Sequence, residues 1–591
     1  MMTRFSGATH DAEGVAAAQL YSAEARIGGP LRQWSPESTV AFFQELDGCT
    51  GAGHSGPVMF HGFLANERQL RRKIGIRDES EVPLAQLVQR LYELFGPSAF
   101  ERLEGHFAAV VWDSGRKQLL LARDRFGLYT IYYARVGKTT MFANRYKILL
   151  GTGLVAPAPD VEAISTYQHT GWVTRGKTFV HGIHSVPSGS VVRLSSEESD
   201  CRTYPIPDQP VVRRARGVAA GEIHTLSESA AQRFATHEER IGIALSSGVD
   251  SSYLAALVKN ANPGSELHTF SVGYGRSDPE LQGAEETARL LGTRHHTTVV
   301  TPEHLKSLWP EAIWHLEDPV GRDQYPCVLA LSRDAASHVR TLYFGNGSDS
   351  SYGGLAVHPH LYWSKKMPVI ASWCEDYLSW LRSSDDPRGV VSSALINLLG
   401  AASMPRPASI VGVNKQPTRV QFDLADDHPL RTQLAKDILT FDGHAGMKHR
   451  LVNSVSGCTV RMPFYDEPMV RHAFSLGDED KIRWFEGKHE LRRAAKACIP
   501  SRIAERPKRI QHLRYDETFS SFIDELADVA ASREVIVNRG LFNPDSVARL
   551  RRHRGAKPYH SKHLYRLWYV IATELWARTF IDNKGATWTP L

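Results

Sequence analysis

Short apolar runs alternate with amphipathic stretches through the second half of the chain. The run Ile241–Leu245 has the length and composition of a buried strand, and the helical spacing that follows it ends near Asn262. Leu267–Gly273 and Thr297–Val300 repeat the strand pattern, with a helix predicted over Gly283–Leu291 between them. This alternation predicts a doubly wound parallel sheet, which binds ligands at the carboxyl ends of its strands.

The first part of the chain is dominated by strand signals and turn residues instead. Buried strands are predicted over His106–Trp112, Gln118–Asp124 and Ile131–Tyr133, and the turns between them predict an antiparallel meander. A proline-punctuated segment, Tyr204–Pro210, separates the two patterns. The predicted domains are residues 1–205 and 211–591.

Composition and charge narrow the class of protein. The 591 residues carry a net charge of +6 and 42% hydrophobic residues, which is the balance of a globular protein and not of a dedicated nucleic-acid binder. Six cysteines form no C-x-x-C pair, so we expect reduced thiols and neither a zinc site nor a disulfide framework. The sequence has no signal-peptide pattern and no apolar run of membrane-spanning length. We expect a cytoplasmic protein with no nucleic-acid or membrane partner.

The turn after the first strand of the second domain is a candidate phosphate site. Ser246-Ser247-Gly248 leads into a helix N-terminus, where free backbone N–H groups and the helix dipole attract an anion. Asp250 would repel phosphate unless a cation lay between them, which predicts Mg²⁺. A second strand-to-turn segment, Thr341–Gly354, carries Asp349 and could share the ion. The alternative is an ordinary serine-rich turn.

This turn resembles the pyrophosphate loop of the ATP pyrophosphatases, which split ATP into AMP and pyrophosphate, and not a Walker A loop. Their S-G-G-x-D-S motif is matched except that Ser247 replaces the first glycine. If this position requires a positive φ, serine costs about 1–2 kcal/mol there. The resemblance implies Mg²⁺ at Asp250 and Asp349 and adenine near Val272 and Gly273. It implies that ATP and pyrophosphate contact Leu245, Ser246, Ser247, Gly248, Val249, Asp250, Ser251, Ser252, Gly345, Gly347 and Lys488.

More of the chain resembles the class B asparagine synthetases. Leu103–Ala108, Ala122–Gly127 and Tyr132-Tyr133 look like their N-terminal glutaminase domain. That resemblance implies the fold of the N-terminal-nucleophile hydrolases, an αββα sandwich of two antiparallel sheets between helices. For residues 211–591 it implies an α/β ATP-pyrophosphatase domain.

The catalytic parts of the glutaminase domain are missing from the sequence. The family uses a cysteine at residue one, whereas the matching segment here is Thr3–Gly7 and the first cysteine is Cys49. Thr3 could be an N-terminal nucleophile only if both preceding methionines were absent. The glutamine-binding stretch N-G-E-I-Y-N reads His61–Asn66 here. We therefore expect a structural remnant that does not hydrolyse glutamine.

The acceptor side of the synthetase motif also departs from the family. Asn346 replaces the first glutamate of G-E-G-A-D-E and Ser350 the second acid. β-Lactam synthetases have a tyrosine at the first position and use it in deprotonating the amine, which asparagine cannot do. Candidate acceptor-site residues are Asn346, Ser348 and Tyr352. Residues 355–450 have no assigned place and are a candidate for shaping the acceptor pocket.

Three basic elements in the C-terminal part also match the family. Arg461–Asp466 resembles R-x-P-F-L-D, and Gly487–Arg492 resembles G-K-x-x-L-R. The resemblance implies that Lys488 reaches the α-phosphate and pyrophosphate, where a cation would offset developing charge; the alternative is a surface lysine at a helix start. Arg506-Pro-Lys508 matches a basic element. His295-His296 could ligate a metal, but the family also has histidines there and a structural role is expected.

The resemblance implies an ATP-dependent, AMP-forming ligase of C–N bonds, with Lys488, Asp250 and Asp349 as its catalytic residues. Among superfamily members without the cysteine, lasso-peptide macrolactam cyclases fit best, with a peptide substrate, a leader-binding protein and a leader peptidase as partners. A β-lactam synthetase or an asparagine synthetase-like amidotransferase is the alternative. A pseudoenzyme scaffold would have to explain the retained catalytic residues, and a tRNA-modifying enzyme is disfavoured by the modest charge.

Overall fold

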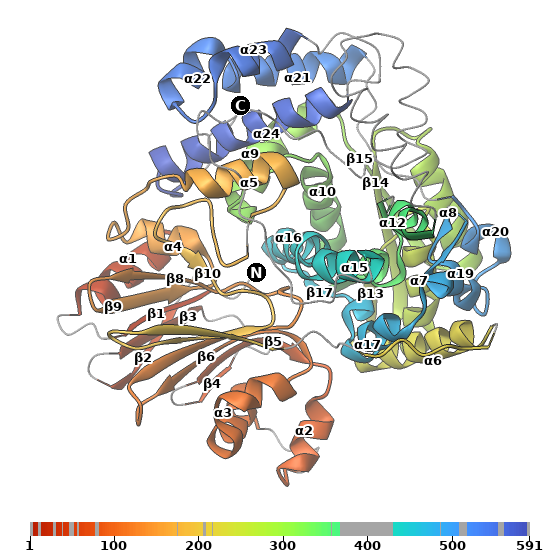
Figure 1. Cartoon of the computed structure of the whole chain (residues 1–591), viewed down its shortest axis with the longest axis horizontal. Coiled ribbons are helices and arrows are strands. Elements are labelled where there is room, and N and C mark those ends of the chain that lie inside the picture. Colours follow the sequence, from red (N-terminus) through yellow and green to blue (C-terminus); the bar gives the residue numbers. More distant parts are fainter. Residues whose placement is uncertain are drawn as a thin grey trace.

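Three large sheets organise the computed structural model, two in the first part of the chain and one in the second (Figure 1). The second part also has a two-stranded sheet among its described residues. The structure describes residues 4–9, 14–27, 31–37, 40–45, 53–55, 58–76, 82–173, 175–204, 209–215, 217–355, 357–366, 429–484, 486–507, 517–552 and 561–587. Thr3, Cys49, Cys374, most of the predicted linker and residues 367–428 of the unassigned stretch lie outside these ranges.

The first two sheets are antiparallel and face one another. Among the described residues each has six strands, in the orders β10-β8-β9-β1-β3-β2 and β12-β11-β7-β6-β5-β4. The first comprises β1 (Phe5–Thr9), β2 (Leu31–Glu37), β3 (Val40–Glu45), β8 (Tyr132–Val136), β9 (Thr139–Ala143) and β10 (His184–Ser185). The second comprises β4 (Gly53–Ser55), β5 (Val58–Leu64), β6 (Gly105–Asp113), β7 (Gln118–Arg123), β11 (Ser190–Leu194) and β12 (Ser199–Thr203).

Alternation along the strands fills both faces of each sheet. Val110 and Leu121 of the second sheet share a core with Phe42 and Phe142 of the first, whereas Val111 points outward to a separate apolar cluster with α3. Helices α1 (Val15–Ile27) and α4 (Tyr146–Gly151) cover the first sheet, and α3 (Leu84–Phe95) covers the second. The remaining helices of this part are α2 (Glu67–Lys73), η1 (Gly96–Arg102) and α5 (Val161–Thr170). The predicted αββα sandwich is confirmed.

The predicted meander is wrong at its third strand. β6 and β7 pair antiparallel as expected, but β8 belongs to the opposite sheet. The chain crosses between the sheets in the turn after β7, where the buried Asp124 carboxylate accepts hydrogen bonds from the backbone N–H groups of Phe126, Leu128 and Tyr129. These bonds satisfy the backbone N–H groups of a buried turn. A chain that crosses between two sheets requires such a turn, whereas a hairpin does not.

The third sheet is parallel, with the order β15-β14-β13-β16-β17 among the described residues. Its strands are β13 (Arg240–Ala244), β14 (Glu266–Gly273), β15 (Arg294–Val299), β16 (Thr341–Tyr343) and β17 (Thr459–Arg461). The strand order reverses between β13 and β16, which is the switch point where such sheets bind ligands. The turn at 246–252 follows β13 and the turn at 345–349 follows β16, so both predicted loops meet at this point.

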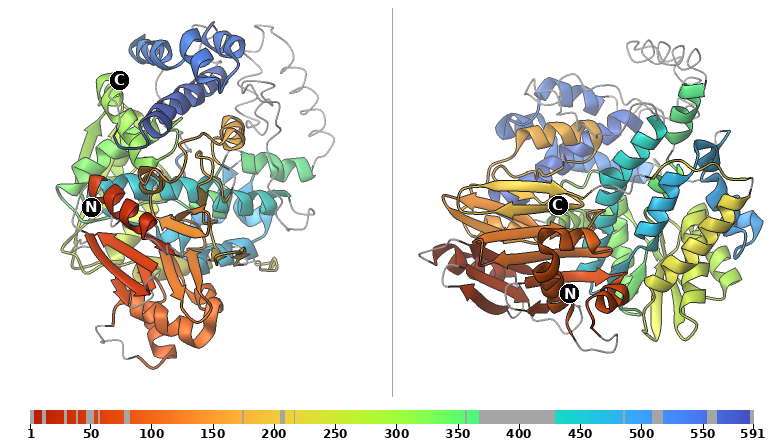
Figure 2. Two further views of the ribbon diagram at one scale, coloured as in Figure 1. Left: turned by 90° about the vertical axis from the view of Figure 1, so that its left-hand side faces the viewer. Right: turned by 60° about the horizontal axis from the view of Figure 1, so that its bottom comes forward.

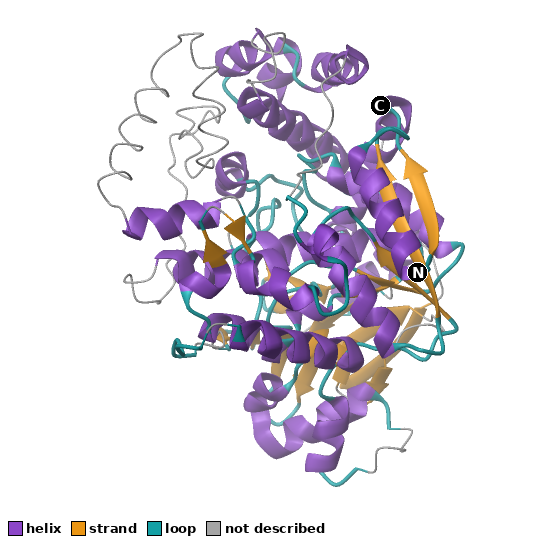
Figure 3. Ribbon diagram, turned by 90° about the vertical axis from the view of Figure 1, so that its right-hand side faces the viewer, coloured by secondary structure: helices purple, strands orange, loops and turns teal. Residues whose placement is uncertain are grey.

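Helices cover both faces of the parallel sheet, as predicted, and Figure 3 shows many of them in front of its strands. One face packs α6 (Val218–Arg233), α7 (Val249–Ala261), α8 (Pro279–Leu291), α17 (Glu467–Ser475), α19 (His489–Ala495) and α20 (Ser501–Ala504). The other packs α9 (Pro302–Leu316), α10 (Gln324–Ala336), α15 (Pro429–Leu439) and α16 (Phe441–Val455). Shorter elements are α11 (Ser348–Tyr352), α12 (Val357–Lys366), η2 (Pro463–Tyr465), α18 (Asp478–Lys481), β18 (Ile482–Arg483) and β19 (Glu486–Gly487).

The C-terminal helices connect the two parts of the molecule. They are α21 (Glu517–Ala530), α22 (Arg533–Arg539), α23 (Pro544–Arg552), α24 (Ser561–Ala577) and η5 (Arg578–Asp582). Helix α24 lies against α5 of the first part, and the rings of Tyr167 and Tyr569 are 4.9 Å apart (Figure 2). Burial of Leu567, Val570 and Trp576 confirms that this helix packs in the core. None of the described helices is long and apolar enough to cross a membrane.

Candidate active site

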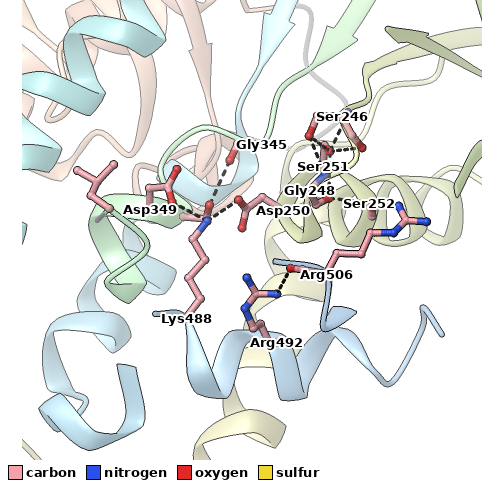
Figure 4. A network of polar contacts seen from close by, with 12 residues as sticks. Ser246, Gly248, Asp250, Ser251, Ser252, Gly345, Asp349, Lys488, Arg492 and Arg506 are labelled. Atoms are coloured by element: carbon pink, nitrogen blue, oxygen red, sulfur yellow. Dashed lines mark hydrogen bonds and ion pairs between the residues drawn. The ribbon is translucent and has the colours of Figure 1, made fainter. Parts of the chain in front are cut away.

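The turn between β13 and α7 is stabilised by its own serines. Ser246 Oγ lies 2.8 Å from Ser251 Oγ and accepts a hydrogen bond of 3.1 Å from the Gly248 backbone N–H. The Ser252 hydroxyl donates to the Gly248 carbonyl at 2.9 Å. These bonds hold the start of α7 at the carboxyl end of β13, with the helix N-terminus facing the switch point (Figure 4).

Ser247 is not strained at its position. The non-glycine residues with positive φ in the described chain are Lys117, Glu317, Trp484, Lys488 and Lys584, so the condition for a backbone penalty at Ser247 is not met. Instead, its backbone N–H donates to Glu280 of α8 at 2.8 Å and its hydroxyl to the same carboxylate at 2.5 Å. Serine therefore adds a link between the loop and α8 that glycine cannot make.

Lys488 joins the two strand-end carboxylates. Its ammonium nitrogen lies 2.5 Å from Asp250 Oδ2 and 2.6 Å from Asp349 Oδ1, and the lysine side chain is only 3% exposed (Figure 4). Burial disfavours the charged form, but the two carboxylates outweigh burial and raise the pKa of Lys488 above its usual value. The sequence placed these three residues at one site, and the structure brings them together.

Two glycines beside this lysine leave no room for a side chain. A Cβ on Gly354 would lie 1.9 Å from Lys488 Cε, and one on Gly487 would lie 2.1 Å from the Gly353 carbonyl oxygen. Lys488 itself has φ 62°, a left-handed conformation rare outside glycine, and its backbone N–H donates to the Tyr352 carbonyl at 3.0 Å. A residue held in this costly conformation at a site of converging charges is typical of a functional position.

Arg506 contacts the backbone of the loop at residues 246–252. Its guanidinium donates to the carbonyls of Ser247 at 3.3 Å and Gly283 at 2.9 Å, and it pairs with Glu286 of α8. Arg492 in turn donates to the Arg506 carbonyl at 2.9 Å (Figure 4). The basic element around Arg506 therefore holds the loop's backbone.

The residues at the switch point fit a magnesium ion. Asp250 Oδ1 is buried and has no hydrogen-bond partner among the described residues, which leaves one carboxylate oxygen for a ligand. Carboxylate oxygens are the ligands that Mg²⁺ prefers. Asp250 and Asp349 together would hold the ion and leave Lys488 to phosphate.

Comparisons with known proteins show the family of the chain. The asparagine synthase family model matches residues 223–578, and the glutamine amidotransferase domain model matches residues 54–205. The chain belongs to the asparagine synthase family. It is an asparagine synthetase-like ligase that forms C–N bonds.

Three relatives show how far the similarity extends. A putative glutamine-hydrolyzing asparagine synthetase of Mycobacterium tuberculosis is 23% identical and covers 89% of this chain and 85% of the relative. Asparagine synthetase 1 of Bacillus subtilis is 24% identical, with coverage of 76% and 74% respectively. Amidase chyE of Penicillium rubens is 28% identical over 53% of this chain and 48% of its own length.

On the predicted acceptor side, Asn346 belongs to a chain of uncharged side chains that are joined by hydrogen bonds. Asn346 Oδ1 lies 2.9 Å from His449 Nδ1, and Gln324 Nε2 lies 3.1 Å from His449 Nε2. Burial lowers the pKa of His449 to about 4. The Gln324 amide nitrogen can only donate a hydrogen bond, so His449 accepts at Nε2 and donates from Nδ1 to the Asn346 side-chain oxygen. All three side chains are uncharged at neutral pH.

The sequence did not anticipate His449 or Gln324 as partners of Asn346. His449 belongs to α16, about one hundred residues further along the chain, within the stretch that had no assigned place. The two other acceptor candidates are buried: Ser348 donates to the Gly345 carbonyl at 3.4 Å, and the Tyr352 ring packs in the hydrophobic core. Tyr352 thus contributes to the site through its carbonyl, which holds Lys488, and its phenol lies in the core.

The remaining predicted nucleotide contacts line the same edge of the sheet. A Cβ on Gly345 would lie 3.3 Å from the Ser251 backbone nitrogen, so the absence of a side chain lets the two loops approach. Gly347 has φ 100°, which favours glycine. Leu245 and Val249 are buried in the core, and Val272 and Gly273 end β14. Whether these residues contact nucleotide stays a prediction.

His61 of the first domain is buried. His61 stands in the segment that matches the glutamine-binding stretch, and its ring packs edge-on against Tyr129 at 4.8 Å and Phe5 at 6.1 Å. Burial, with Arg450 nearby, lowers the pKa of His61 to about 3. A neutral imidazole in an aromatic cluster is a packing residue.

Proposed function

We propose that the chain is an AMP-forming amide synthetase that adenylates a substrate carboxylate and transfers the acyl group to an amine other than glutamine-derived ammonia. The observation that carries this proposal is the meeting of Asp250, Asp349 and Lys488 at the switch point of the sheet. Anion-attracting N–H groups at the start of α7 lie beside them.

The reaction has two steps. A carboxylate oxygen of the substrate attacks the α-phosphorus of ATP, and the bond to the bridging oxygen breaks, giving an acyl-adenylate and pyrophosphate. The amine nitrogen then attacks the acyl carbon, the bond to the AMP oxygen breaks, and the amine loses its proton to the surrounding base or solvent. Lys488 would offset the negative charge on the leaving pyrophosphate. Mg²⁺ held by Asp250 and Asp349 would supply neutralisation of the triphosphate.

Two features support an amine source other than glutamine. The glutamine amidotransferase match begins at residue 54, after the N-terminal strand where the family carries its nucleophile. The sequence has no cysteine before Cys49, and His61 packs in the core at the glutamine-binding stretch. The amine would therefore come from a substrate.

The finer proposal is a lasso-type macrolactam synthetase. Such an enzyme joins an Asp or Glu side chain of a peptide to the N-terminal amine of the same peptide, with a leader-binding protein and a leader peptidase as partners. It is supported by the neutral chain at Asn346, which replaces the tyrosine of β-lactam synthetases and the glutamate of asparagine synthetases. Helix α16, which supplies His449, belongs to the long stretch that could accommodate a peptide.

An asparagine synthetase-like amidotransferase that uses free ammonia is the second candidate. It is favoured by the names of the relatives that cover most of the chain. The two proposals differ in the acid that is activated. Aspartate alone supports adenylation in an asparagine synthetase, whereas a macrolactam synthetase requires a peptide.

ATP–pyrophosphate exchange tests both proposals directly. The full chain is incubated with labelled pyrophosphate, Mg·ATP and either aspartate or peptides that carry an internal Asp or Glu. Exchange only with peptides supports the macrolactam synthetase, and exchange with aspartate supports the second candidate. The Lys488→Met variant should lower exchange by about 10²–10³-fold. If no acid supports exchange and calorimetry detects no Mg·ATP binding, the chain is a scaffold and both proposals fail.

A further inference from the structure

Three histidines lie close together at one end of the parallel sheet. The loops at residues 246–252 and 345–349 lie at the opposite end. His268 is near the start of β14, His296 near the start of β15, and His338 just before β16. One nitrogen from each ring lies within 4.8 Å of the others. Because Ser246 and Gly345 follow the carboxyl ends of parallel strands, this cluster is separate from the site of Lys488.

The neighbouring His295 is not part of the cluster. Successive side chains of a strand point to opposite faces, and His295 Nδ1 lies 3.0 Å from the Thr269 hydroxyl on the other face. The adjacent pair His295-His296 therefore cannot bind one ion together. The structure instead brings together three histidines from separate segments of the chain. The sequence alone does not show that they are neighbours.

Two of the three histidine rings have a carboxylate near one ring nitrogen. Glu266 Oε2 lies 3.3 Å from His268 Nε2, which places the proton on that nitrogen and directs the Nδ1 lone pair toward His296 Nε2, 3.0 Å away. Asp334 Oδ1 lies 3.9 Å from His338 Nε2. A carboxylate behind the ligating imidazole is the arrangement that orients histidines in metal sites.

We propose that His268, His296 and His338 form a zinc-type transition-metal site that staples β14, β15 and the approach to β16. Imidazole nitrogens suit Zn²⁺, whereas Mg²⁺ prefers oxygen, so this site and the carboxylate site would select different ions. The metal would displace the proton that now lies between His268 and His296. Three protein ligands leave a fourth position for water.

Closing the site requires the His338 ring to turn, because it now lies against the His296 ring with the ring centroids 4.1 Å apart. Zn–N bonds of about 2.0–2.1 Å place tetrahedral ligand nitrogens roughly 3.3 Å apart. The His268–His296 separation of 3.0 Å already approaches this value. His338 has a side chain that is 34% exposed, so its ring can move inward and leaves a path for the ion.

Zinc titration of the metal-stripped full chain tests the proposal, with a chromophoric chelator as competitor and excess Mg²⁺ to occupy oxygen sites. We expect about one Zn²⁺ per chain, and Co²⁺ substitution should give the visible bands of a tetrahedral site. His338→Ala and Glu266→Gln should each weaken binding at least tenfold. His295→Ala, on the same strand with its ring on the other face, should bind as the wild type does.

Two results would overturn the site. One is a wild-type chain that takes up no stoichiometric zinc in this competition. The other is His338→Ala binding zinc as tightly as His295→Ala, which would make the cluster only a hydrogen-bonded imidazole group. Because His338 is partly exposed, its alanine variant is expected to fold, and circular dichroism checks this before titration. Pyrophosphate exchange by the zinc-free chain is a separate measurement, so failure here is distinguishable from failure of the proposed ligase activity.

Discussion

Replacing Gly354 with alanine perturbs Lys488 without touching its charge. Gly354 does not have a positive φ, so alanine adds no backbone strain. Its Cβ would lie 1.9 Å from Lys488 Cε and 2.1 Å from Asp349 Oδ1. Carbon atoms in ordinary contact are about 3.5–4.0 Å apart, so the lysine must withdraw by roughly 1.5–2 Å.

That displacement exceeds what the two ion pairs can tolerate. They are 2.5 and 2.6 Å long, and charge-assisted hydrogen bonds of this kind weaken beyond about 3.2 Å. A misplacement of about 1 Å at a reacting centre costs about 100-fold in rate, or about 2.7 kcal/mol of transition-state stabilisation. We expect Gly354→Ala to lower ATP–pyrophosphate exchange by at least about 100-fold, with the acid that supports exchange in the wild type.

The control is Gly275→Ala, because a Cβ there meets nothing within 4 Å and the glycine has no positive φ. A double-mutant cycle separates the steric effect on Lys488 from general damage: in a Lys488→Ala background, where only the contact with Asp349 Oδ1 remains, Gly354→Ala should lower exchange by much less than it does in the wild-type chain. Exchange by Gly354→Ala within threefold of the wild type would refute the reasoning. Additive losses in the cycle would do the same.

Three further substitutions test two buried carboxylates and the loop at Ser247. Glu317→Ala leaves Arg145, 3.1 Å from Glu317 Oε1, as a buried charge without its carboxylate, so denaturant unfolding should show a loss of about 3–5 kcal/mol, and Glu317→Gln a smaller loss. Burial raises the pKa of Asp466 to about 7. Its contribution to stability is therefore present at low pH and is lost as pH rises through 7. The melting temperature of Asp466→Asn, relative to that of the wild type, should increase between pH 5 and pH 8. Ser247→Gly removes the hydroxyl bond to Glu280 and relieves no strain, so it should destabilise the chain by about 1 kcal/mol and not tighten Mg·ATP binding in calorimetry.

The loops at residues 246–252 and 345–349 could be predicted from sequence because their geometry is local. A strand, a small-residue turn and a helix fix where Asp250 lies, and the same pattern fixes Asp349. Parallel strands end at one edge, so the two carboxylates had to lie near one another once the strands were neighbours. The pairing of β13 with β16 supplies that condition. No additional long-range information was needed.

The features that escaped prediction depend on contacts between distant segments. The crossing from β7 to β8 depends on the other sheet, and a turn that leads into a hairpin has the same local signals. His449 reaches Asn346 from α16, and Gly354 is required because the Lys488 side chain and the Asp349 carboxylate lie against it. The histidine cluster likewise needs the register of β14 against β15, in which Phe270 lies opposite His296.

Lys488 also explains how the two carboxylates can face one another. In the Lys488→Met variant, Asp250 and Asp349 lose the cation between them, and repulsion between the two like charges favours protonation of one carboxylate. A carboxyl group with a raised pKa in the folded state loses its stabilising contribution as pH increases. The variant should therefore melt at a lower temperature at pH 8 than the wild type, and the difference should shrink at pH 5.

Magnesium supplies the matched test of this charge balance. At pH 8, Mg²⁺ without nucleotide should raise the melting temperature of Lys488→Met more than that of the wild type, because in the variant the ion takes the place of the ammonium group. Lys306→Met, which removes a half-exposed surface lysine paired with Glu525, is the control for loss of a cation elsewhere. Equal shifts in all three proteins would mean that the two carboxylates do not form a cation site, and the magnesium assignment at the switch point would be wrong.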